Sequence, residues 1–248
     1  MPRAARIRSN SGIYHIIMRG INRQRVFEDE EDYERYLWLL KNYKAQCGFD
    51  LYAWCLMPNH IHLLLKEGRE PLEQVFRRIG TSFVYWYNGK YERIGHLFQD
   101  RYKSEAVEDD SYFLTVLRYI HLNPVKAGIC TEPSEYPYSS YGNYFENDAV
   151  DHDLVERMIG RKEFERYHRK NDNDICMDIQ DEVVRRITDE QVRKLLQENF
   201  DCENVSQVQQ LTEEKKTHAI QLLLGSGASI RQVSRLTGIS FGIVRKYT

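Results

Sequence analysis

Alternating apolar and polar positions divide the first half of the chain into short strands and amphipathic helices. Residues 13–19 (IYHIIMR) are β-branched and aromatic and stop at Gly20, which is typical of a strand. Residues 29–47 carry acids in their first turn and an apolar stripe at helical spacing before Gly48, so we expect a helix there. Residues 49–57 (FDLYAWCLM) are predicted as a second strand.

The next segments complete one sheet domain. Residues 60–65 (HIHLLL) follow a Pro-Asn turn as a third strand, and residues 71–89 form a helix with proline at its first position. Residues 96–107 (HLFQDRYKSEAV) are predicted as a fourth strand and residues 109–122 as a third helix. The order β-α-β-β-α-β predicts an α+β fold, a ferredoxin-like antiparallel sheet with helices on one face and the other face free.

The third strand carries two histidines separated by one apolar residue. Because side chains alternate between the faces of a strand, His60 and His62 project from one face while Ile61, Leu63 and Leu65 point to the other. Nothing in the packing of the apolar face demands histidine opposite it. Imidazole is the commonest metal ligand in proteins, and two on a rigid strand supply two ligands for a divalent ion. We therefore predict that His60 and His62 bind a metal.

The composition excludes several classes of protein. No stretch approaches the ~20 apolar residues of a membrane span, and residues 1–12 lack the apolar core of a signal peptide, so we expect a cytoplasmic protein. The five cysteines are scattered and show no Cys-x-x-Cys spacing. This pattern fits a reducing compartment and argues against a zinc-cysteine site.

The net charge of −2 conceals an uneven distribution. Residues 1–25 carry six arginines and no acid, residues 66–103 carry eight bases against five acids, and residues 206–248 carry six against two. Residues 130–205 hold ten bases against nineteen acids. Separate basic regions on a nearly neutral chain suit a polyanion that touches several places, although ordinary fluctuation on solvated faces is an equal alternative.

The pattern of the second half of the chain predicts helices. We expect residues 1–130 to hold the sheet, residues 131–205 to form an acidic, mostly helical connector, and residues 206–248 to form a helix-turn-helix domain. Within the connector, helical patterns cover residues 151–170 and 181–200, with the Asn/Asp-rich linker NDNDICMD between them.

The C-terminal domain is predicted to contain three short helices: EKKTHAIQLLLG, SIRQVSRLTG and SFGIVRKYT. The turn before Ser240 has helix-turn-helix spacing, and Ser240 is a suitable cap for the last helix. That helix carries Arg245 and Lys246, so we predict contacts with duplex DNA there. A three-helix bundle without DNA binding is the alternative.

The third helix places Tyr119 and Asn123 one turn apart on the same edge. A tyrosine can be a nucleophile, but its pKa near ~10 means that it needs help from cations or a metal-polarised electrophile. Asn123 can offer its carbonyl oxygen to the same ion. Two alternatives stay open, since Tyr119 also fits a core-edge aromatic and Asn123 fits a cap for a short turn from Pro124. Tyr112 is a rival nucleophile, but its i+4 neighbour Val116 cannot ligate.

Taken together, these features resemble the HUH superfamily of single-strand DNA nucleases. More closely, the chain resembles the REP-associated tyrosine transposases, relatives of the small single-tyrosine insertion-sequence transposases. YHIIMRGINRQRVF, AWCLMPNHIHLLL, HLFQDRYKSEAV and YFLTVLRYIHLNPVKAGI carry this resemblance, which covers most of residues 2–145. Phe98 and His121 stand where the family often has Trp and Glu. The C-terminal hundred residues lie outside it, although some relatives carry a terminal helix-turn-helix.

The resemblance implies a transposase-like single-strand DNA endonuclease and strand transferase. Tyr119 would attack a phosphodiester next to an imperfect hairpin, leaving a 5′-phosphotyrosine and a free 3′-OH that can later reverse the step. His60, His62 and Asn123 would hold Mg²⁺ or Mn²⁺, and the two nitrogen ligands favour tolerance of manganese. Either a monomer or a homodimer is compatible with it.

Contacts with single-stranded or hairpin DNA are expected from polar and basic residues near the first and last strands. These are Arg19, Asn22, Arg23, Arg25, Arg101 and Lys103.

Two other functions remain possible from the sequence. A domesticated DNA-binding protein without turnover would keep the basic regions and the C-terminal bundle, but the intact site residues argue against it. A metal hydrolase or isomerase acting on a small molecule would need a third His or carboxylate ligand and leaves the basic regions unexplained. His15 is the candidate for that ligand, but a buried, hydrogen-bonded histidine is the simpler interpretation.

Overall fold

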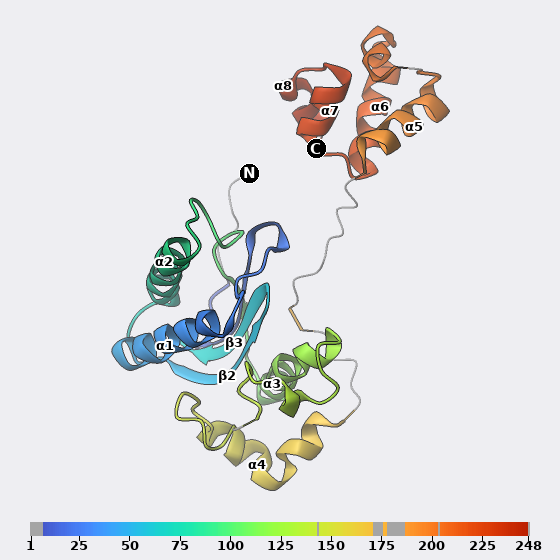
Figure 1. Ribbon diagram of the computed structural model, residues 1–248. Helices are drawn as coiled ribbons and strands as arrows, with labels where there is room; N and C mark the ends of the chain where they lie inside the picture. Colours follow the sequence, from blue (N-terminus) through green and yellow to red (C-terminus); the bar gives the residue numbers. More distant parts are fainter. Residues whose placement is uncertain (1–6, 143, 171–175, 178–186, 203, 248) are drawn as a thin grey trace. The chain divides into compact units, whose positions relative to one another are not determined.

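The chain folds into two compact units, residues 1–179 and residues 180–248 (Figure 1). The computed structural model describes residues 7–142, 144–170, 176–177, 187–202 and 204–247. The basic residues 1–6, most of the NDNDICMD linker and the first part of the helix expected from residue 181 lie outside these described residues. Within them, no helix is both long enough and apolar enough to cross a membrane.

The first unit is built on four strands, β1 (Ile13–Arg19), β2 (Asp50–Met57), β3 (His60–Lys66) and β4 (Lys103–Ala106). They lie in the order β2-β3-β1-β4, and all neighbours are antiparallel. The mixed fold with an antiparallel sheet agrees with the sequence prediction. The fourth strand is shorter than predicted, because Phe98 forms only an isolated bridge with Gly20 and regular pairing begins at Lys103.

Helices α1 (Glu30–Cys47) and α2 (Leu72–Lys90) lie together on one side of the sheet (Figure 1). Asp29 caps α1 in a reciprocal capping box, and Gly48 ends it with a φ of 70°, a conformation that glycine adopts without strain. The hydroxyl of Tyr36 on α1 lies 3.5 Å from the Met18 sulfur of β1. Ile61, Leu63 and Leu65 of β3 thus form the main core together with the even-numbered residues of β1.

Helix α3 (Asp110–Lys126) covers the opposite side of the sheet (Figure 1). The predictions that helices lie on one face and that the histidine face is free are therefore wrong. The reason is that α3 has an apolar stripe of its own, and its Phe113 packs edge-on against Tyr52 of β2, with centroids 5.1 Å apart. The helix also continues through Pro124 beyond its predicted end at Leu122.

Residues 136–142 and 144–151 run along the outer edge of β2. The hydroxyl of Tyr136 donates to the Leu56 carbonyl at 2.6 Å, and that of Tyr144 donates to the Tyr52 carbonyl at 2.7 Å. The amide of Ser140 donates to the Trp54 carbonyl at 2.9 Å. Helix α4 (Asp153–His168), kinked at Gly160, follows and packs against α3. The first part of the predicted connector therefore belongs to the first unit.

The second unit contains α5 (Asp189–Phe200), α6 (Glu213–Gly225), α7 (Ile230–Thr237) and α8 (Phe241–Val244). Short 3₁₀ helices occur in this unit at Val205–Gln210 and Arg245–Tyr247, and in the first unit at Ile21–Arg23 and Pro133–Glu135. Val192 and Leu196 of α5 are buried in the same core as Leu223 of α6 and Val233 of α7. The unit thus begins before the predicted boundary at residue 206, since the apolar face of α5 is part of its core.

Candidate functional site

The three predicted metal ligands meet between β3 and α3. The ring centroids of His60 and His62 are 4.9 Å apart on one face of β3. Asn123 reaches between them from α3, with its Nδ2 3.2 Å from Nε2 of His62 and its Oδ1 3.4 Å from Nε2 of His60. The alternative that Asn123 caps a following turn is wrong, because α3 continues and the amide faces the histidines.

The donor set of this cluster fits a divalent cation. Nδ1 of His60 lies 2.7 Å from Oδ1 of Asn59 and donates to it, which leaves the lone pair on Nε2. That lone pair faces Oδ1 of Asn123, which is also an acceptor. With the Asn123 amide in this orientation, Nε2 of His60 and Oδ1 of Asn123 are both acceptors. Two acceptors directed at each other are the arrangement that a cation between them stabilises.

His62 is fully buried. Burial, and then the neighbouring imidazoles of His60 and His15, lower the pKa of His62 well below its ordinary value. The imidazole is therefore neutral at neutral pH, which is the form that ligates a metal.

Tyr119 lies beside the histidines. Its ring is 5.8 Å from that of His62 and 6.0 Å from that of His15, edge-on in both cases. Nζ of Lys126 lies 4.5 Å from the centre of the Tyr119 ring, within the range of a cation–π contact. The side chain is only 5% exposed, so it is also packed in the core. Tyr119 is thus a buried aromatic at the edge of the core and lies beside the histidine cluster.

Tyr112 is held elsewhere. Its hydroxyl donates to Oε2 of Glu105 on β4 at 2.6 Å. Burial first, and then the Glu105 carboxylate, raise the pKa of Tyr112 above its ordinary value. Its phenolate is thus harder to form than that of a free tyrosine, which argues against Tyr112 as the nucleophile.

The sequence did not indicate the partners of His62. His15 of β1 is completely buried, and its Nε2 lies 3.1 Å from Nδ1 of His62. Glu105 lies on the other side of His15, and interaction with His15, before that with Tyr112, lowers the pKa of Glu105. The interpretation of His15 as a buried, hydrogen-bonded histidine is confirmed. Its partner depends on strand register, which one sequence does not reveal.

The predicted DNA contacts occupy different surfaces. Arg19 pairs with His60 across the sheet, and Lys103 pairs with Ile17, which pairs with His62. Cross-strand partners share a face, so Arg19 and Lys103 project from the histidine face.

The other predicted contacts are exposed. Asn22 and Arg23 form a turn after β1 with positive φ angles of 51° and 63°. Arg25 forms an ion pair with Glu28 at 3.2 Å, and Arg101 lies 3.9 Å from Glu73. Arg245 and Lys246 are exposed in the second unit, directly after α8.

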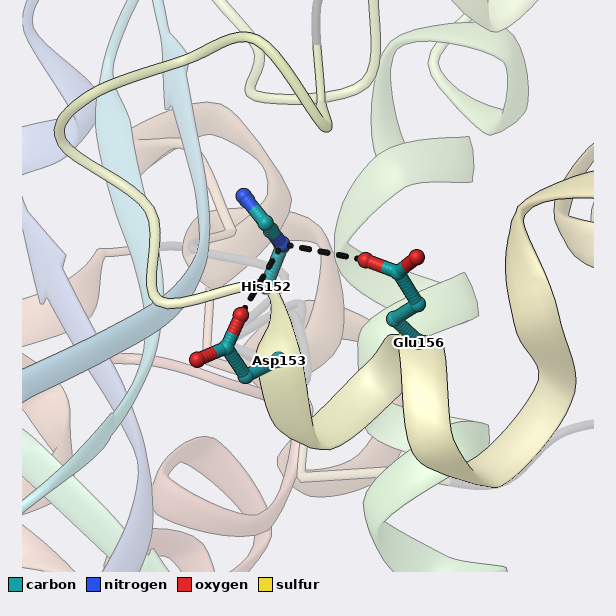
Figure 2. A group of neighbouring side chains, drawn as sticks. All are labelled: His152, Asp153 and Glu156. Atoms are coloured by element: carbon teal, nitrogen blue, oxygen red, sulfur yellow. Dashed lines mark ion pairs between the residues drawn. The ribbon is translucent and has the colours of Figure 1, made fainter.

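A second group of potential ligands lies at the start of α4, where Figure 2 shows His152, Asp153 and Glu156. Both carboxylates approach the same nitrogen, Nδ1 of His152, at 3.5 and 3.6 Å. Arg161 also pairs with Glu156 at 2.9 Å. This group is a surface ion-pair network in which Arg161 already compensates a carboxylate, unlike the cluster of acceptors around Asn123.

Part of the first unit matches a known protein family. Residues 8–123 match the model of the family described as "Transposase IS200 like". The matched range includes His60, His62, Tyr119 and Asn123. Residues 8–123 thus resemble the IS200-like transposase family. The family match thus ends at Asn123, while the folded unit continues through α4.

Curated relatives of this chain carry a more specific name. A REP-associated tyrosine transposase of Escherichia coli is 27% identical over 127 residues, which are 47% of this chain and 74% of the relative. A putative REP-associated tyrosine transposase of Haemophilus influenzae is 29% identical over 113 residues, 40% of this chain and 64% of the relative. A solved structure described as a REP-associated tyrosine transposase bound to a REP hairpin matches 73% of this chain and 94% of its own, with a TM-score of 0.52 and 19% identity. That likeness shows a shared fold.

Proposed function

We propose that this chain is a metal-dependent, single-tyrosine DNA endonuclease and strand transferase of the HUH type that acts next to DNA hairpins. The convergence of His60, His62 and Asn123 beside Tyr119 is the observation that carries the proposal. The strand order β2-β3-β1-β4 supports the ferredoxin-like interpretation of the sheet. The solved structure described as a REP-associated tyrosine transposase bound to a REP hairpin supports hairpin DNA as the substrate class.

In the proposed reaction, the Tyr119 oxygen attacks the phosphorus of a phosphodiester. A bond from the tyrosine oxygen to phosphorus forms, the bond from phosphorus to the 3′ oxygen breaks, and the phenol proton is transferred so that the 3′ end leaves as a hydroxyl. The same 3′-OH can attack the phosphotyrosine and reverse the step. Lys126 above the Tyr119 ring places a positive charge beside the developing phenolate.

His60, His62 and Asn123 would hold Mg²⁺ or Mn²⁺. When bound, such an ion polarises the scissile phosphate and stabilises the leaving oxygen. The low pKa of His62 keeps its imidazole in the ligating form. Arg19 and Lys103, which project from the same face, are suited to hold the phosphate backbone across the site.

The test is an adduct assay with a matched tyrosine control. Wild-type protein is incubated with hairpin-bearing single-stranded DNA from the flanks of its own gene, with Mn²⁺ or Mg²⁺, and denatured. We expect a covalent adduct that requires metal, persists in Tyr112→Phe and is absent in Tyr119→Phe. An adduct lost in Tyr112→Phe but retained in Tyr119→Phe would overturn the assigned nucleophile. Tight hairpin binding without an adduct in any metal would favour the domesticated DNA-binding protein.

For the second unit we propose contact with duplex DNA. The helix α7, the turn before α8 and the basic residues Arg245 and Lys246 support it. In this case the salt dependence of duplex binding should become shallower by about two phosphate contacts in the double variant Arg245→Gln/Lys246→Gln. An unchanged slope would argue for a bundle with another role.

A further inference from the structure

His15 lies directly behind the proposed metal ligand His62. The two imidazoles are nearly parallel, with centroids 5.3 Å apart and an angle of 24° between the planes. In the register of β1 and β3, His15 pairs with Leu64 and Ile17 pairs with His62, so the two histidines are diagonal neighbours on one face. The contact between Nε2 of His15 and Nδ1 of His62 is therefore built into the sheet.

Glu105 and Tyr112 continue this line of polar groups away from the site. Glu105 of β4 pairs directly with His15, and its Oε2 lies 3.8 Å from Nδ1 of His15. The same carboxylate oxygen accepts the Tyr112 hydroxyl at 2.6 Å and the Met177 amide at 3.1 Å. Two donors thus hold Glu105 in place behind His15.

One choice of tautomers for His62 and His15 fits the contacts between them and Glu105. If Nε2 of His62 presents its lone pair to Asn123 or to an ion, its proton is on Nδ1 and is donated to Nε2 of His15. His15 then carries its own proton on Nδ1, which faces the carboxylate of Glu105. The hydrogen bond between His15 and His62 thus couples their tautomers, and the Glu105 carboxylate lies 3.8 Å from Nδ1 of His15, at ion-pair and not hydrogen-bond distance.

We propose that His15 is a positioning residue that holds His62 in the tautomer and orientation needed to bind a divalent cation, with Glu105 and Tyr112 holding His15 in turn. This inference rests on the proposed metal site. Partners behind a ligating histidine typically change metal affinity by about 10–100-fold when they are lost, because the ligand loses its orientation and basicity. Tyr112 thus supports the metal site indirectly, by holding Glu105 behind His15.

The same unit contains a matched control. His121 of α3 and His168 of α4 form a second buried imidazole pair, with Nδ1 of His121 2.9 Å from Nε2 of His168. Neither contacts the cluster at Asn123. Substitution of His168 therefore disturbs a buried histidine pair of the same unit without removing a group behind His62.

The experiment measures Mn²⁺ binding to the full chain by calorimetry, without DNA. His15→Phe keeps an aromatic ring but removes the acceptor, and we expect its Mn²⁺ affinity to fall about 10–100-fold. His15→Gln keeps a side-chain oxygen that can accept from His62 and should retain more affinity. His168→Phe should bind Mn²⁺ within about twofold of wild type. His168 is a partner of His121 and not of His62, and only the partners of a ligating histidine should affect metal affinity.

A second measurement reads the tautomer without metal or activity. Nitrogen-15 NMR of the histidine side chains should show His62 protonated on Nδ1 in the wild type and a mixture of tautomers in His15→Phe. Wild-type Mn²⁺ affinity in His15→Phe, or an equal loss in His168→Phe, would overturn the role of His15. Failure of the wild type to bind Mn²⁺ would overturn the metal site itself, and the inference with it.

Discussion

The two buried histidine pairs of the first unit differ in how their hydrogen-bond chains end. The chain through His121 and His168 is closed at both ends, because Ser140 Oγ lies 2.8 Å from Nε2 of His121 and Nδ1 of His168 donates to the Phe164 carbonyl at 2.8 Å. The chain through His15 and His62 instead ends at the amide of Asn123, beside a second imidazole whose lone pair meets an oxygen.

The difference shows that burial alone does not distinguish structural histidines from ligands. Burial is the first cause of a lowered pKa in both His62 and His121. What differs is whether each ring nitrogen meets a group of the opposite kind. In a closed chain every donor has its acceptor, whereas converging acceptors leave room for a cation.

Removing one histidine from each hydrogen-bond chain should produce the largest difference in activity. His60→Ala should reduce formation of the DNA adduct by more than about 100-fold, since loss of an outer partner alone costs 10–100-fold. His121→Phe should retain the adduct at temperatures where it is folded. The assay is the rate of adduct formation with Mn²⁺. Equal losses in both variants would mean that the two pairs do not differ in function.

The next effect is on stability. His168→Phe should lower the free energy of unfolding by roughly 1–3 kcal/mol, because it leaves the Nδ1–H of His121 buried without its acceptor. Urea unfolding followed by tryptophan fluorescence isolates this effect, since all three tryptophans (Trp38, Trp54 and Trp86) lie in the first unit. An unchanged unfolding midpoint would show that the closed chain contributes little to stability.

A smaller effect concerns pH. Burial lowers the pKa of His168 to about 4, below the 6.5 of an ordinary histidine. The unfolded chain therefore binds more protons between these values, so stability is complete above about pH 6.5 and falls toward pH 4, by up to about 1.4 kcal/mol per pH unit. Urea unfolding across this range should give a shallower slope for His168→Phe. A slope equal to that of wild type would contradict the low pKa.

The smallest change in Mn²⁺ affinity is expected at Tyr112, the polar group farthest from His62 in the line through His15 and Glu105. Tyr112→Phe removes one of the donors to Glu105, two groups away from His62, so Mn²⁺ affinity should fall only ~3-fold, less than the loss of a direct partner. Calorimetric titration measures this change. A loss as large as that of His15→Phe would mean that Tyr112 acts on the site by another route.

Local sequence patterns were sufficient for most elements of the first unit. The strand at residues 13–19 is confirmed at both ends, and the helix after Asp29 is confirmed because its caps are encoded within a few residues. The strand expected from residue 96 was too long, since Leu97 and Phe98 are apolar but pair with the sheet only through an isolated bridge. Apolar character reports burial, whereas strand pairing needs a partner elsewhere in the chain.

Those parts of the candidate site whose alignment depends only on the spacing of residues within one strand or helix could be predicted from the sequence. The two-residue period of a strand aligns His60 with His62, and the helical period aligns Tyr119 with Asn123. The contact of His15 with His62 depends on the register of two strands 47 residues apart, which local periodicity does not contain. The same holds for α3, whose position over the histidine face follows from tertiary packing.

The hydrogen bonds from Tyr136, Ser140 and Tyr144 to the outer edge of β2 affect how copies of this protein can associate. An exposed edge strand is a template for pairing with another chain, which leads to sheet extension or aggregation. Here the outward carbonyls of Tyr52, Trp54 and Leu56 already accept from Tyr144, Ser140 and Tyr136. Strand addition at β2 would require Tyr136, Ser140 and Tyr144 to detach first. The tyrosine-rich loop therefore protects the long edge of the sheet and leaves the short strand β4 as its outer edge on the other side.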